Sequence, residues 1–151
     1  MDFITDLLQN QVFVSAALGW LVAQVLKTLI HLILTKQFVA ERMVGSGGMP
    51  SSHSATVCAL ATSTGIKYGG GSFEFAITAM LAIIVMYDAM GVRRETGKQG
   101  RVLNEMMEVF MNMGKQISVE ERLKEFVGHT PLQVLMGAIL GTLIAVAVMG
   151  V

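Results

Sequence analysis

Four segments of the chain are apolar over the length of a helix, and polar residues divide them into two kinds. Val12 to Leu34, Phe73 to Tyr87 and Pro131 to Val151 carry few polar residues, and the first and last hold 23 and 21 residues. A helix of about 20 apolar residues is long enough to cross a bilayer. Pro50 to Lys67 is interrupted by serines and threonines. We therefore predict four membrane helices, the second of them buried by the other three.

Small residues recur at helical spacing in the second and fourth segments, a pattern that favours close helix packing in lipid. They are Ser52, Thr56, Ala59 and Ser63 in the second segment, and Gly137, Gly141 and Ala145 in the fourth. The predicted fold is therefore all-α: an integral membrane helical bundle with about four transmembrane helices, plus short amphipathic helices.

The longest polar region runs from Gly91 to His129 and is expected to carry the amphipathic helices. Apolar residues recur there at helical spacing, at Val102, Leu103, Met106, Val109, Phe110 and Met113. Ser118 to Glu121 has the pattern of a capping box and predicts a second short helix. No linker or repeat divides the chain, so residues 1–151 are expected to form a single domain.

Composition agrees with a membrane protein. Hydrophobic residues make up 53% of the chain and charged residues 15%, whereas soluble domains carry about 25% charged residues. The net charge is zero, which gives no field that would attract nucleic acid. Cys58 is the single cysteine, and no Cys/His or carboxylate cluster has metal-binding spacing. We expect no metal and no cofactor.

The distribution of basic residues predicts the orientation. Nine of the eleven lysines and arginines fall in two loops, Thr35 to Met49 and Gly91 to Thr130, which a four-span topology places on one side. The positive-inside rule makes that side cytoplasmic. Asp2 and Asp6, together with the length of the apolar stretch that follows, argue against a cleaved signal peptide.

The stretch before the second helix is the first candidate for chemistry. Pro50 favours the first helical turn, and the hydroxyls of Ser51 and Ser52 stand where a helix start binds anions, phosphate above all. His53 can donate a proton to a leaving oxygen. The alternative is an ordinary serine N-cap followed by a polar helix face.

Cationic residues flank the same side of the membrane. Arg93 and Arg94 follow Asp88 at the end of the third segment, and adjacent arginines can fork onto phosphate oxygens. The alternative is that these arginines only set the orientation of the chain in the membrane. Lys27 lies about 10 Å inside its helix end, on one face with Gln24 and His31. An intramembrane lysine is a functional candidate, although snorkelling to the headgroups is the alternative.

His129 precedes the last segment, in Gly128-His129-Thr130-Pro131. A neutral imidazole can attack phosphorus and form a phosphohistidine, although a lone interfacial histidine is more often structural. Topology places this histidine, the start of the second helix and the end of the third at one membrane face. Two histidines, two arginines, a lysine and a hydroxyl-rich helix start therefore are expected to converge there.

These motifs resemble those of the type 2 phosphatidic acid phosphatase and vanadium haloperoxidase superfamily. Pro50-Ser51-Ser52-His53 is similar to its Pro-Ser-Gly-His motif, and Gly128 to Val134 is similar to its third motif. The chain from about residue 12 to 150 resembles the small divergent bacterial branch, with its helix-one lysine, Gly-Gly-Met-Pro-Ser-Ser-His and Asp-Ala-x-Gly-Val-Arg-Arg. The resemblance implies a helical bundle and metal-independent phosphate-ester hydrolysis, with His129 as nucleophile and His53 as general acid.

The chain departs from the superfamily pattern at charged positions. Gln133 replaces the aspartate that orients the nucleophilic histidine, and Ser52 replaces a glycine. Leu123 stands where an arginine is expected, and Arg42 is followed by Met43 in place of proline. If the protein is an enzyme, Lys27, Arg93 and Arg94 must supply those charges.

The resulting hypothesis is a phosphatase of the bacterial cytoplasmic (inner) membrane, acting on a lipid or isoprenoid phosphate from the cytoplasmic side. Ser51, Ser52, Lys27, Arg93 and Arg94 would bind phosphate, and Asp88 and Gln133 would support the histidines. Membrane lipids and a second copy of the chain are the other expected partners. One alternative is a weak or inactive relative that binds anionic lipid headgroups or a membrane partner, and another is a small transporter subunit with Lys27 lining a pore.

Overall fold

The computed structural model describes residues 2–36, 48–113 and 128–151, without the side chains of residues 92–94 and 111. The described residues form six helices and no strand. The helices are α1 (Phe3–Gln9), α2 (Gln11–Thr35), α3 (Ser52–Tyr68), α4 (Phe73–Met90), α5 (Val92–Asn112) and α6 (Pro131–Met149). The all-α prediction is confirmed, and α1 is a helix that the hydrophobic pattern did not indicate.

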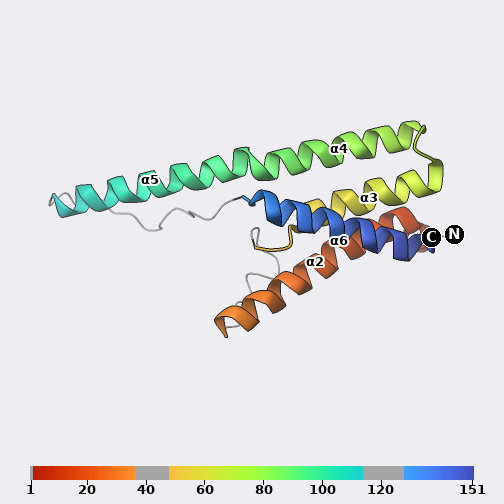
Figure 1. The fold of residues 1–151 in the computed structure, drawn as a ribbon, viewed down its shortest axis with the longest axis horizontal. Helices are drawn as coiled ribbons and strands as arrows, with labels where there is room; N and C mark the ends of the chain where they lie inside the picture. The colour runs from red at the N-terminus through yellow and green to blue at the C-terminus, as the bar shows by residue number, and fades with distance from the viewer. Residues whose placement is uncertain (1, 37–47, 114–127) are drawn as a thin grey trace.

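Four helices form the bundle, and α3 lies at its centre. Within the described residues α3 packs against α2, α4 and α6, whereas α4 barely touches α6. Figure 1 shows α3 and α4 side by side, with α2 crossing α3 and α6 at an angle. The expectation that the second helix is covered by the others is therefore confirmed.

Small residues let these helices approach closely. A Cβ atom built at Gly141 would overlap the carbonyl oxygen of Ala55, and one at Gly19 would lie 2.9 Å from the same oxygen. Ala55 itself is completely buried. Such contacts replace the hydrophobic driving force that is missing between helices in lipid. The predicted seam of Gly137, Gly141 and Ala145 is the buried side of α6.

Length and hydropathy qualify three of the helical stretches as membrane spans within the described residues: Gln11–Thr35, Phe73–Phe110 and Pro131–Met149. The central helix α3 has 17 residues and a more polar sequence. Its polar side chains are tolerated because they are buried among the other helices: Ser54 and Ser63 have no exposed surface. Hydroxyls of this kind bond back to the helix, as Ser63 Oγ does to the Ala59 carbonyl at 2.7 Å.

The predicted start of the second helix needs a small correction. Pro50 was expected within the first turn, but α3 begins at Ser52, with Ser51 as its N-cap. Pro50 lies two residues before the helix, next to the N-cap, and is buried. The Ser51 hydroxyl accepts the first-turn N–H of Ser54, which makes a proline at N1 unnecessary.

Helix α5 extends the line of α4 beyond the ends of the other helices (Figure 1). It contains the predicted amphipathic segment but begins at Val92, ten residues before Val102, the first residue of the predicted apolar stripe. The second short helix predicted at Ser118 to Glu121 lies outside the described residues.

Candidate phosphate site

Two backbone hydrogen bonds join three helix ends at one end of the bundle. The N–H of Ser51, at the start of α3, donates to the carbonyl of Gln133 in the first turn of α6 at 3.0 Å. The N–H of His129 donates to the carbonyl of Ala89, in the last turn of α4, also at 3.0 Å. The convergence that the topology predicted is present for the start of α3, the end of α4 and the start of α6.

His129 is held by the capping box that begins α6. The Thr130 hydroxyl accepts the N–H of Gln133, and Oε1 of Gln133 accepts the N–H of Thr130 at 3.0 Å. The same Oε1 lies 3.3 Å from Nδ1 of His129. Because Oε1 can only accept, Nδ1 carries the proton in the neutral ring. The lone pair of that ring is then on Nε2, the atom that a nucleophilic role requires.

The rings of the two candidate catalytic histidines lie against each other in a T-shaped arrangement. The ring centroids of His53 and His129 are 6.0 Å apart and their planes meet at 62°. His53 lies in the first turn of α3 and is half-buried, whereas His129 is 3% exposed. Burial of a polar ring costs free energy unless it is bonded, and His129 has bonds from both its backbone and Nδ1.

Ser51 and Ser52 occupy different positions at the start of α3: Ser51 is the N-cap and Ser52 is the first residue of the helix. The Oγ of Ser51 accepts from the N–H of Ser54 at 3.3 Å and lies 3.1 Å from the Oγ of Ser54. Ser51 is thus the N-cap that the sequence offered as an alternative to a phosphate ligand, and its own N–H is bonded to Gln133. Ser52 is 5% exposed and lies on the first turn of the helix.

Lys27 is buried within the bundle, at 2% exposure. This burial argues against snorkelling, which would place the ammonium group in the headgroup region. Gln24, one turn earlier on α2, is 5% exposed, and its Oε1 has no hydrogen-bond partner among the described residues. His31 is half-buried. Because α2 packs Gly19 against Ala55 and runs opposite to α3, Gln24 lies near the level of the α3 start.

Three predicted site residues lie where α4 meets α5. Asp88 is half-buried in the last turn of α4, one residue before the carbonyl that holds His129. Arg93 and Arg94 follow in the first turn of α5, but their side chains lie outside the described part of the structure. The described residues contain no group of three His, Cys, Asp or Glu side chains able to hold a metal ion.

Sequence reasoning missed two residues that position the site. Thr130 organises the capping box around Gln133, and the Ala89 carbonyl anchors the backbone of His129. The first had a readable signal, since Thr130-Pro131-Leu132-Gln133 fits the Ser/Thr-x-x-Glu/Gln pattern of a capping box. A backbone contact between distant helices leaves no such pattern.

Comparison with known proteins gives a concordant answer. The model of the Divergent PAP2 family matches residues 8–144. The chain belongs to this family. It is also 36% identical over 148 residues to the uncharacterized membrane protein YuiD of Bacillus subtilis, an alignment that covers 92% of this chain and 94% of that protein. No solved structure matches the chain.

Membership confirms the resemblance drawn from the motifs, and the apolar helices with this relative support a membrane location. The matched residues 8–144 include every candidate site residue from Lys27 to Gln133.

Proposed function

We propose that this protein is a membrane phosphatase that hydrolyses a lipid-linked or isoprenoid phosphate through a phosphohistidine at His129. The observation that carries the proposal is the contact between Nδ1 of His129 and Oε1 of Gln133, with the ring of His53 lying against that of His129. The contact leaves Nε2 as the basic atom of a fixed ring. The adjacent imidazole of His53 supplies an acid.

The reaction follows in two displacements. Nε2 of His129 attacks phosphorus while the bond from phosphorus to the ester oxygen breaks, and His53 donates a proton to that oxygen. Water then attacks the phosphohistidine, the phosphorus–nitrogen bond breaks, and His53 takes the proton of the water. The net change is one ester and one water converted to an alcohol and inorganic phosphate, with both histidines restored.

The ring spacing suits these transfers. Reacting atoms approach to about 3 Å in a productive complex, and a proton donor lies about 3 Å from its acceptor. With their centroids 6.0 Å apart and their planes at 62°, the two rings are in edge contact. A phosphate would therefore lie beside the pair of rings, with Nε2 of His129 on phosphorus and a nitrogen of His53 on the ester oxygen.

Binding of the phosphate needs cations and N–H donors, because phosphoryl transfer depends mainly on positioning and charge stabilisation. We assign charge stabilisation to Lys27, Arg93 and Arg94. At the start of α3 we assign donation to the N–H and hydroxyl of Ser52, with Ser51 in a capping role. Asp88 would hold a cation or a histidine of the site. The basic loops would place the site on the cytoplasmic side of the bacterial cytoplasmic membrane.

Phosphate release from purified protein in detergent with EDTA tests this proposal. The substrates are phosphatidic acid, phosphatidylglycerol phosphate and a polyprenyl phosphate. His31→Ala is the matched control, because His31 is the third histidine of the chain and is also partly buried. Activity should survive the chelator, fall to background in His129→Ala and persist in His31→Ala. Vanadate, which resembles five-coordinate phosphorus, should inhibit the enzyme. Full activity at millimolar vanadate would count against the phosphohistidine.

A second candidate is an inactive relative that binds anionic headgroups. The capping box favours it, because Gln133 has a structural reason to be present that requires no chemistry. Protein that binds phosphatidic acid in vesicles but releases no phosphate from any of the three substrates would establish this function instead.

A further inference from the structure

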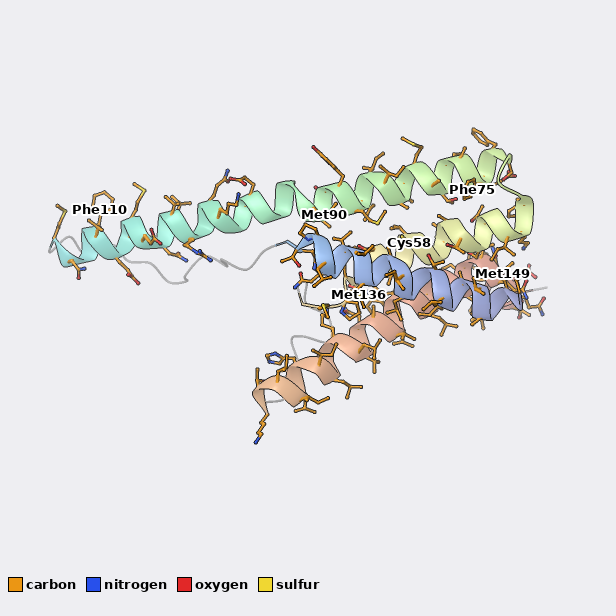
Figure 2. All side chains as sticks on the ribbon, in the orientation of Figure 1. Cys58, Phe75, Met90, Phe110, Met136 and Met149 are labelled. Carbon is orange, nitrogen blue, oxygen red and sulfur yellow. The ribbon has the colours of Figure 1, made fainter. Side chains whose placement is uncertain are left out.

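Helix α5 carries a long exposed apolar side. Within the described residues it packs only against α4. The apolar side chains along it remain open to solvent, with exposed fractions of 53% at Val102, 49% at Met106, 56% at Val109 and 71% at Met113. Its 21 residues span roughly 30 Å at 1.5 Å per residue. Figure 2 shows Phe110 near the far end of α5, remote from the four-helix bundle. An apolar stripe of this length normally has a binding partner.

The side of α5 about a quarter of a turn from the apolar side is charged, and the opposite side holds the buried Gly97, Gly100 and Asn104. Lys98, Arg101, Glu105 and Glu108 follow one another at intervals of three and four residues, and all are exposed. Such spacing puts them on one face of the helix. Lys98 also pairs with Glu95 at 2.8 Å on the surface. A helix whose exposed surface is an apolar side bordered by charged residues, placed next to a membrane span, has the character of an interfacial helix.

The phase of the two helices shows which way the apolar side faces. Ile84 of α4 and Val102 of α5 are 18 residues apart, about five turns at 3.6 residues per turn, and Ile77 and Met113 are 36 residues apart, about ten turns. Ile77 and Ile84 are 51% and 60% exposed on the outer, lipid-facing side of α4. The apolar side of α5 is therefore a continuation of the lipid-facing side of α4.

Gly91 is the joint between them. Its backbone, with φ −94° and ψ −87°, departs from helical values. The hydrogen bonds on either side persist, from the Gly91 N–H to Tyr87 and from the Glu95 N–H to Gly91. In the structure α5 continues the line of α4 (Figure 1). A bend at this joint away from the bundle would turn the common side of α5 onto the bilayer beside α4.

We propose that α5 lies on the membrane surface, with its apolar side inserted among the lipid headgroups next to the candidate site. Arg93, Arg94, Lys98 and Arg101 fall in its first half, close to the membrane, where anionic headgroups attract basic residues. Because the end of α4 also holds His129, the bend would leave the site at the lipid–water boundary. This proposal does not depend on catalysis.

The test compares fluorophores on the apolar side and on the charged side of α5 in the full chain. In a Cys58→Ala background, Met106→Cys and Glu105→Cys form a matched pair, with Val109→Cys and Glu108→Cys as an independent second pair. Each variant is labelled with an environment-sensitive dye and reconstituted in phosphatidylethanolamine–phosphatidylglycerol vesicles. Dyes at 106 and 109 should emit at shorter wavelength and be quenched at least 2-fold more by lipid-borne quenchers than dyes at 105 and 108. Aqueous iodide should show the reverse preference.

Equal quenching by iodide on both sides would show that α5 stands in water and would overturn the proposal. Shielding of positions 106 and 109 from both quenchers, with spin labels at 106 coming within 20 Å of one another, would also overturn it. That result would identify a second copy of the chain as the partner of α5.

Discussion

The two ends of the bundle are built by different means. At the site end, the start of α3, the end of α4 and the start of α6 are joined by backbone hydrogen bonds from Ser51 and His129. At the other end, α3 and α4 are joined by the turn Gly69–Gly71, where a Cβ at any of the three positions would meet nothing within 4 Å. Ser72 closes that turn locally, with its hydroxyl on the Gly69 carbonyl at 2.8 Å.

The constraints of this fold are concentrated at the site end. Polar groups within a bilayer must be satisfied internally, so the buried His129 and the bonded helix ends at the site require several helices in fixed positions. The glycine turn requires only that two helices be connected. Substitutions should therefore have unequal consequences at the two ends.

Removal of the proposed nucleophile is the largest expected effect. His129→Ala should lower phosphate release by about 10⁴-fold or more, because side chains that act as a unit fail together. Gly70→Ala, in the turn at the opposite end, should leave turnover within 2-fold of wild type. Steady-state phosphate release at equal folded concentration measures both. Wild-type turnover by His129→Ala would remove the nucleophile assignment and favour the binding protein.

The second prediction concerns the charge beside His129. A carboxylate at position 133 would stabilise the imidazolium that forms during catalysis. Acid–base groups of this kind typically raise the rate by about 10²-fold or more. Both Gln133→Glu and Gln133→Asp place a carboxylate there and should raise turnover. The capping box sharpens this expectation, because Glu retains the N3 contact to Thr130 whereas the shorter Asp cannot reach it equally well.

The comparison of these two variants is therefore decisive. Gln133→Glu should raise kcat, and Gln133→Asp should raise it less and lower the unfolding temperature. If neither variant changes kcat, another acid serves His129, and Asp88→Asn should then be severely impaired. Asp88 is the acid on α4 next to the Ala89 carbonyl that holds the His129 backbone.

The sequence predicted the bundle well because its signal is local. Apolar length marked α2, α4 and α6 within a few residues, and the hydroxyl-rich segment was correctly placed in the middle, since only burial tolerates such a helix in lipid. Motif order brought His53, His129 and Gln133 to one end. The pattern left open whether Ser51 is an N-cap or a phosphate ligand, and the capping box of Thr130 and Gln133 was readable but missed. The hydrogen bond from His129 to the Ala89 carbonyl joins distant helix ends and leaves no pattern in the sequence.

The third prediction tests close packing at the centre. Gly141→Ala would drive a Cβ into the backbone of Ala55, which cannot move without separating α3 from α6. Overpacking of this kind typically costs 1–3 kcal/mol. Gly70→Ala, with open space around it, should change stability by less than about 0.5 kcal/mol. Thermal unfolding in one detergent measures both, and an equal effect of the two substitutions would contradict the close contact of α6 with α3.

The smallest effect compares one hydroxyl at each end. Thr130 and Ser72 are both N-caps, accepting the N–H of Gln133 at 3.4 Å and of Phe75 at 3.1 Å. Loss of either hydroxyl should cost about 1 kcal/mol of stability. Only Thr130→Ala should also slow phosphate release, by about 3- to 10-fold, because it loosens Gln133 and with it the tautomer of His129. Ser72→Ala should keep wild-type kcat. Thr130→Ser, which retains the hydroxyl, should restore the rate. Equal kcat for Thr130→Ala and Ser72→Ala would mean that the capping box begins a helix and has no further influence on the histidine beside it.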